Sequence, residues 1–140
     1  MDEVNRRSAM TLGLTVAVAA PLVALSTPAA AEMYGAGAGK EIMPGIRQVE
    51  LGEWPVKFGG YTRAVANDYI MGPGAAFPEE TMKNDMLCQI MEGEIQINQD
   101  GNMMAAKTGH VYSCMVGTVE TDKNEGDTSA IMRVIDLFPA

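Results

Sequence analysis

Short apolar runs, separated by turn-forming residues, follow one another along most of this chain. This pattern is typical of many strands rather than of a few long helices. An apolar period of 3.6 residues does not persist for three turns anywhere beyond residue 32. We therefore expect an all-β protein. The predicted strands cover residues 46–51, 62–71, 86–91, 94–98, 103–107, 111–114 and 130–138, with a hairpin turn at Asp100-Gly101.

The first 31 residues have a different pattern. The paired arginines Arg6 and Arg7 precede a moderately apolar run at residues 11–25, and three alanines occupy residues 29–31. This arrangement is similar to a twin-arginine export signal with a signal-peptidase site. A membrane anchor is the alternative, but Pro21 interrupts the run, which falls short of the roughly 20 apolar residues that a span needs. We predict a signal peptide over residues 1–31, no membrane anchor after cleavage, and a periplasmic or secreted protein.

The chain that remains after cleavage is small and acidic. The formal net charge is −8, and the two acids of the signal segment balance its two arginines, so the excess lies in the rest of the chain. Phosphate backbones repel such a surface, so we expect no nucleic-acid partner. Residues 32–45 contain four glycines and have the composition of a flexible lead-in. Residues 46–140 then form one domain.

A spacing of glycine and asparagine near the C-terminus carries a resemblance to a known family. Gly109, Gly117 and Asn124 have the spacing of the second conserved cupin motif, G-x5-P-x-G-x2-H-x3-N. Met115 stands where that motif has proline, and Glu120 stands where it has a metal-binding histidine. The sequence therefore resembles a cupin, and the resemblance implies a single-domain, RmlC-like jelly-roll β-barrel.

The first cupin motif, G-x5-H-x-H-x3-4-E-x6-G, has a counterpart between Gly74 and Gly93. Its two histidine positions fall on Glu80 and Met82, and its glutamate position falls on Met86. Cupins generally hold one divalent metal with three histidines and a glutamate, and many use it for oxygenation, isomerisation or decarboxylation. None of the four matching positions keeps the family residue, and thioether sulfur binds hard divalent ions poorly. We therefore expect the barrel without its usual metal site and without a divalent metal cofactor.

Strand alternation predicts which side chains face the inside of the barrel. If residues 80–91 are extended, the even positions share one face, which is mostly soft and apolar. Such a lining suits either a packed core or an apolar pocket better than a catalytic metal cage. Both alternatives stay open at this point. The predicted pocket-lining residues are Glu80, Met82, Met86, Cys88, Met115 and Glu120.

Glu80 and Glu120 are the candidate acid–base pair. If both point inward, as the matching positions do in cupins, two acids in a space of low dielectric constant supply a general acid or base. The alternative is that both lie hydrated at the mouth of the barrel, or that Glu79 rather than Glu80 points inward. No residue receives a catalytic role from the sequence alone.

Cys88 and Cys114 are the only cysteines of the chain. An even count in an exported protein favours a disulfide, whereas both positions lie in apolar strand patterns where a reduced cysteine is an ordinary core residue. The sequence leaves the disulfide open. The lone histidine, His110, follows Gly109 at a turn and is expected to be exposed. Residues 122–125 are expected to form a solvated loop.

Three functions remain open from the sequence. We favour a non-catalytic barrel that is structural or binds a small, partly apolar molecule. The second is an enzyme that uses Glu80 and Glu120 as acid and base or as ligands of a weakly held metal. The third is a periplasmic copper-handling protein that offers Cu(I) the sulfur atoms of Met82, Met86, Cys88, Cys114 and Met115. Pairing of edge strands into a homodimer is compatible with the family resemblance, but no residue specifies it.

Overall fold

The structure is a computed structural model that describes residues 33–140. The predicted signal segment, residues 1–31, lies outside the described residues. Ten strands and no helix make up the described part of the chain, which confirms the all-β class. In this part, accordingly, no helix is long and apolar enough to cross a membrane. The strands are β1 Lys40–Met43, β2 Ile46–Phe58, β3 Tyr61–Met71, β4 Ala76–Thr81, β5 Asp85–Glu92, β6 Glu94–Gln99, β7 Asn102–Lys107, β8 Val111–Cys114, β9 Val119–Lys123 and β10 Ala130–Pro139.

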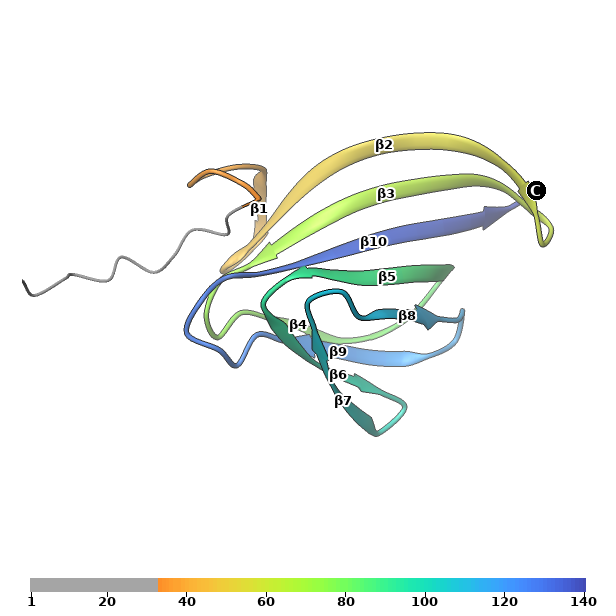
Figure 1. Ribbon diagram of the computed structural model, residues 1–140. Helices are drawn as coiled ribbons and strands as arrows, with labels where there is room; N and C mark the ends of the chain where they lie inside the picture. Colours follow the sequence, from red (N-terminus) through yellow and green to blue (C-terminus); the bar gives the residue numbers. More distant parts are fainter. Residues whose placement is uncertain (1–32) are drawn as a thin grey trace, which may run out of the picture.

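The strands form two antiparallel sheets (Figure 1). The larger sheet has the order β1-β2-β3-β10-β5-β8, and the smaller sheet has the order β4-β9-β6-β7. Strands that are far apart in sequence pair with each other, such as β3 with β10 and β4 with β9. The core lies between the two sheets, because Ile90 of β5 and Ile97 of β6 are fully buried in one cluster. This arrangement is a jelly roll.

The period of two in the sequence determines which side chains enter this core. In β5 the even residues Cys88 and Ile90 are buried, whereas Leu87, which precedes Cys88 and points to the opposite face, is 44% exposed. In β6 Ile95 and Ile97 are buried on the core face. Successive side chains of a strand point to opposite faces of the sheet, so the inward face predicted for the even positions of β5 is confirmed.

All seven predicted strands are present, and three further strands were missed: β1, β4 and β9. β1 lies within residues 32–45, where we expected only a flexible lead-in, and it pairs with the start of β2. The guanidinium group of Arg47 also donates hydrogen bonds to the carbonyl oxygens of Gly37, Ala38 and Gly39. These contacts hold the glycine-rich segment against the larger sheet, which its composition alone does not predict.

Glycines at turns and close contacts, and the buried Asn124, shape the connections between the strands. Asp100 and Gly101 both have positive φ angles, 51° and 87°, which confirms the predicted hairpin between β6 and β7. A Cβ atom on Gly93 would lie 2.9 Å from the Cβ atom of Ala130, so no larger residue fits there without a shift. The side-chain amide of Asn124 donates to the carbonyl oxygens of Met71 and Thr128 at 2.9 and 2.8 Å.

The prediction of a solvated loop over residues 122–125 was wrong for its first three members. Asp122 and Lys123 belong to β9, and the side chains of Asp122 and Asn124 are buried. β9 lies between β4 and β6 in the smaller sheet, so alternate side chains of this polar segment point into the barrel. Two acids of one strand, Glu120 and Asp122, are therefore placed inside the molecule.

Candidate functional site

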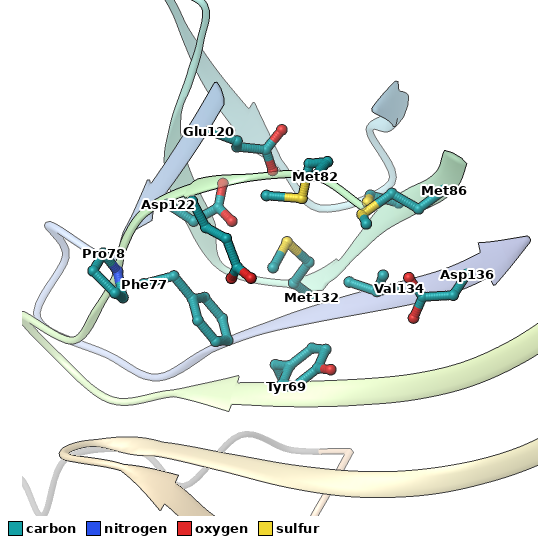
Figure 2. A pocket seen from close by; sticks show the side chains of 12 residues that line it. Tyr69, Phe77, Pro78, Met82, Met86, Glu120, Asp122, Met132, Val134 and Asp136 are labelled. Atoms are coloured by element: carbon teal, nitrogen blue, oxygen red, sulfur yellow. The ribbon is translucent and has the colours of Figure 1, made fainter. Parts of the chain in front are cut away.

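A cavity of about 130 Å³ opens between the two sheets (Figure 2). Its walls come from strands β3, β4, β5, β9 and β10 and from the turn that joins β4 to β5. Four of its side chains are acids, namely Glu80, Glu120, Asp122 and Asp136. Four contain sulfur, namely Met82, Met86, Cys88 and Met132. Aromatic and apolar groups complete the wall, namely Tyr69, Phe77, Pro78 and Val134.

Five of the six predicted pocket-lining residues line this cavity, and one does not. Met115 is 67% exposed and lies on the outer surface, beside Leu87 and Ile135. β8 ends at Cys114, so the alternation of strand faces does not extend to Met115, which begins a turn. The prediction was wrong at this position because the motif alignment placed Met115 without regard to where the strand ends.

Glu80 and Glu120 are direct partners across strands β4 and β9, but their environments differ. Glu80 is exposed at the mouth of the cavity, as the hydrated alternative expected. Glu120 is 3% exposed, and one of its carboxylate oxygens accepts a hydrogen bond of 2.7 Å from Nε2 of Gln99. The structure therefore separates the candidate acid–base pair into one rim acid and one interior acid.

The acid that shares the interior with Glu120 is Asp122. The two residues are two positions apart on β9, so their side chains point to the same face (Figure 2). Asp122 is 5% exposed, and its Oδ1 atom has no hydrogen-bond partner among the described residues. Burial, followed by the charge of Glu120 and a hydrogen bond to it, raises the pKa of Asp122 to about 8. Asp122 therefore keeps its proton near neutral pH.

Sequence reasoning missed Asp122, although one signal was available. Glu120 was placed inside the barrel by its motif position, and Asp122 follows it by two residues, which is the period of a strand. The segment reads Val-Glu-Thr-Asp-Lys and has no apolar face, so it did not look like a strand. A polar strand whose polar side faces inward can be found only by combining the motif position with the alternation.

Burial also favours the neutral forms of three other groups in the cavity wall, Asp136, Cys88 and Tyr69. Burial raises the pKa of Asp136 and that of the Cys88 thiol. Burial and, next, the charge of Asp136 raise the pKa of Tyr69. Among the residues that the structure describes, no lysine, arginine or histidine lines this cavity. The space is thus acidic in composition and has no cation of its own to balance its acids.

Cys88 and Cys114 are buried free thiols, so the disulfide that the sequence left open is not formed in the structure. The register of β5 and β8 explains this, because Cys88 lies opposite Tyr112 and Cys114 lies opposite Met86. Burial and a hydrogen bond to Glu120 raise the pKa of Cys114 to about 12. His110 is exposed, as expected.

The four positions that correspond to cupin metal ligands do not form a set that fits a hard divalent ion. They present two carboxylates, one of them at the rim, together with the thioethers of Met82 and Met86. Iron, manganese and zinc prefer imidazole and carboxylate, and thioether sulfur adds little to such a site. Within the described chain, no group of three histidine, cysteine, aspartate or glutamate side chains is placed to hold a metal ion.

The architecture and the position of the cavity define a class of protein, the cupin-fold jelly rolls. No protein-family model matches the sequence, and no curated protein sequence matches it. An RmlC-like cupin from Shewanella frigidimarina is similar in structure, with 19% identity, a TM-score of 0.59, and coverage of 72% of this chain and 82% of that one. The chain therefore has the RmlC-like cupin fold.

Two further solved structures indicate how varied the proteins of this fold are. The cupin domain of an XRE family transcriptional regulator from Enterobacter cloacae has 14% identity and a TM-score of 0.56, with coverage of 69% of this chain and 99% of that one. A sugar phosphate isomerase of the cupin superfamily from Silicibacter pomeroyi has 21% identity and a TM-score of 0.56, with coverage of 68% and 60%. These likenesses establish the fold, and the function must be argued from the cavity.

Proposed function

We propose that this protein is an exported, small-molecule-binding barrel that lacks the standard cupin metal centre. The observation that carries the proposal is the unpartnered Oδ1 atom of Asp122 in the cavity wall. A buried polar atom without a partner costs about 1–3 kcal/mol of folding free energy. The described fold does not offset this cost, whereas a ligand with a hydrogen-bond donor would do so.

The size and lining of the cavity support a small, partly apolar ligand. A cavity of about 130 Å³ is close to the ~150 Å³ that accommodates benzene in an engineered protein core. Methionine side chains are flexible and adapt to irregular shapes, so Met82, Met86 and Met132 suit a binding wall. The four acids line the same cavity and supply the polar contacts that orient a ligand.

Export rests on the N-terminal segment, whose paired arginines, apolar run and alanine site are similar to a twin-arginine signal. We propose a periplasmic or secreted location on this basis. The measurement is the N-terminal sequence of protein recovered from the periplasm or medium, which we expect to begin at Glu32. A full-length chain found only in the cytoplasm would contradict the proposed export.

The binding function is tested by thermal shift across a set of small metabolites, followed by a pair of matched variants. Val134→Phe fills the cavity, whereas Val111→Phe adds the same ring at an exposed position on the outer surface. We expect at least one compound to raise the melting temperature of the wild type and of Val111→Phe, but not that of Val134→Phe. A compound that stabilises both variants equally binds elsewhere, and a set without any stabilising compound contradicts the proposal.

An enzyme is a second candidate, and the protonated carboxyl group of Asp122 beside Glu120 favours it. An acid whose pKa lies near neutral pH can both donate and accept a proton during a reaction. In this case Asp122 replaces Glu80 in the acid–base pair that the sequence suggested. Once a ligand is known, its turnover by wild-type protein and by Asp122→Asn decides: a loss of about 100-fold or more supports general acid–base catalysis, and the absence of turnover leaves binding alone.

Copper handling is a third candidate, because several sulfur atoms approach the same cavity. The side chains of Met82, Met86 and Met132 converge in Figure 2, and the thiol of Cys88 also lines the space. Thioether and thiol groups suit Cu(I). Competition with a Cu(I) chelator tests this candidate, which fails if Met82→Leu combined with Met86→Leu leaves the affinity unchanged.

A further inference from the structure

We infer that the cavity binds a small organic cation, in which an ammonium group is attached to a short apolar body. The inference rests on the proposed binding function and names the chemical class of the ligand. It follows from three features of the described residues: the charge of the cavity wall, the unpartnered acid, and the apolar surface next to that acid.

The charge of the wall has one sign. Strands β4, β9 and β10 each contribute at least one acid to the cavity, and the described lining residues include no base. Nearby basic side chains are engaged elsewhere: Arg133 pairs with Asp68 and Lys123 pairs with Glu125. An anionic ligand would meet only like charge in this space, whereas a cation would meet opposite charge at short range.

Asp122 provides an independent indication of a cationic donor. More than nine-tenths of this residue is buried, it lines the cavity, and its Oδ1 atom lacks a hydrogen-bond partner. The nearby amide of Gln99 cannot supply one, because its Nε2 atom already donates to Glu120 and to the carbonyl oxygen of Ser113. An ammonium group supplies both the missing donor and the charge that balances an ionised carboxylate.

The remaining wall suits the apolar body of such a ligand. The rings of Tyr69 and Phe77 meet edge to face, with centroids 5.3 Å apart, and Met132 lies beside them (Figure 2). Aromatic faces attract cations, and the methionine and valine side chains remove alkyl groups from water. A bare metal ion would leave this apolar surface unused, so the composition of the wall favours an organic cation.

Binding of a cation beside Asp122 has a measurable signature, which is the release of a proton. Ionised Asp122 pairs with a cation, so binding must release the proton that Asp122 holds near neutral pH. None of the described residues that line the cavity around Asp122 is a base that could take up that proton. The titratable groups around Asp122 and Glu120 are Tyr69 on β3, Glu80 on β4, Cys88 on β5, Tyr112 and Cys114 on β8, and Asp136 on β10.

The test compares three four-carbon probes of one shape: butylammonium, 1-butanol and butyrate. Calorimetry in two buffers of different ionisation enthalpy gives both the affinity and the number of protons released. We expect butylammonium to bind at least tenfold more tightly than 1-butanol or butyrate. Its affinity should rise about tenfold per pH unit between about pH 6 and pH 8, with one proton released per cation bound.

Two single-charge variants separate the cavity from the general charge of the protein. Asp122→Asn removes the buried acid and should abolish both the preference for butylammonium and its pH dependence. Glu79→Gln removes an exposed acid that does not line the cavity, and it should leave both unchanged. Melting curves of both variants check that each is folded. The number of protons released is measured on the wild type, so this part of the test does not depend on the folding of a variant.

Three results would overturn the inference. If 1-butanol or butyrate binds as tightly as butylammonium, the cavity does not select a cation, although the proposed binding function stands. If Glu79→Gln weakens butylammonium binding as much as Asp122→Asn, the attraction comes from the net charge of the protein. If butylammonium does not bind even at pH 8.5, the ligand class is wrong, and the metabolite screen alone then decides on the binding function.

Discussion

Two buried aspartates of the same jelly roll, Asp68 and Asp122, have opposite surroundings. Asp68 is fully buried, and the guanidinium group of Arg133 donates to both of its carboxylate oxygens at 2.8 and 2.9 Å. The hydroxyl group of Tyr34 donates to the same carboxylate. Asp122 is 5% exposed, has no basic partner among the described residues, and leaves one oxygen without any partner.

The faces of β10 explain where each acid lies. Arg133 lies at an odd position and points away from the cavity, whereas Met132 and Val134 line it. Asp68 therefore belongs to the outer side of the larger sheet, where Tyr34 of the N-terminal segment covers it. The fold satisfies this acid completely. An acid that the fold leaves unsatisfied is instead a candidate for function, because native structures rarely keep such groups without a use.

The largest expected change in stability comes from removing the carboxyl group of Asp68, whose hydrogen bonds the fold satisfies. Asp68→Ala leaves the guanidinium group of Arg133 without its carboxylate partner and should lower the free energy of unfolding by about 3–5 kcal/mol. Tyr34→Phe removes one hydrogen bond to the same carboxylate and should cost about 1 kcal/mol. Chemical denaturation measures both. A loss below about 1 kcal/mol for Asp68→Ala would show that the pair is not structural.

Removing the unsatisfied acid, Asp122, should instead stabilise the protein at high pH. The pKa of Asp122 in the folded protein, about 8, lies above the ordinary value of 3.8. Its contribution to stability is therefore fully present below about pH 4 and is lost as the pH rises through about 8. Asp122→Asn should flatten this decline, and at pH 9 its free energy of unfolding should exceed that of the wild type by about 2–3 kcal/mol.

The control for this effect is an acid on the surface. Asp127→Asn removes one charge from an exposed position in the segment between β9 and β10, and its stability should show the same pH dependence as that of the wild type. Denaturation series at pH 5, 7 and 9 compare the three proteins. If Asp122→Asn declines with pH as steeply as the wild type, the buried acid is not the source of the linkage.

The thiols next to the acid pair should react slowly in the folded protein. Burial raises the pKa of Cys88 and that of Cys114, so little nucleophilic thiolate forms at neutral pH. A thiol reagent should modify both cysteines quickly in denaturant and neither in native buffer. An intact mass that increases by two daltons on reduction would instead reveal a disulfide and contradict the free thiols of the structure.

The smallest change in stability is expected for the acid at the mouth of the cavity. Glu80 lines the mouth of the cavity but is exposed, so Glu80→Gln should change the free energy of unfolding by no more than about 0.5 kcal/mol. Glu120 lies directly opposite Glu80 on the neighbouring strand but is buried beside Asp122. Glu120→Gln should therefore also change the pH dependence of stability, because the charge of Glu120 helps to raise the pKa of Asp122. Equal effects of the two variants would mean that rim and interior acids share one environment.

The comparison also separates what the amino-acid pattern can predict from what it cannot. Alternation in β5 and the spacing of Gly109, Gly117 and Asn124 led to the correct fold class, because both reflect local backbone geometry. The same alternation predicted that Met86 and Cys88 face the cavity, and both line it, whereas Met82 lines it from the turn that joins β4 to β5.

Asp122 and Met115 were misplaced for a different reason. The inward side of β9 is polar, so its burial depends on the neighbouring strands β4 and β6 rather than on its own residues. Met115 follows the last residue of β8, and only the end of pairing there turns its side chain outward. Both positions depend on tertiary contacts, which a single strand pattern does not contain.

The most direct test of this account is a carbon-detected NMR titration of the Asp122 carboxyl group in the ligand-free protein. Our account predicts an inflection near pH 8, because Asp122 shares a buried space with Glu120 and no cation. The inflection should move to lower pH when butylammonium is bound. An inflection near pH 4, the ordinary value of an exposed aspartate, would show a hydrated carboxylate and contradict the account.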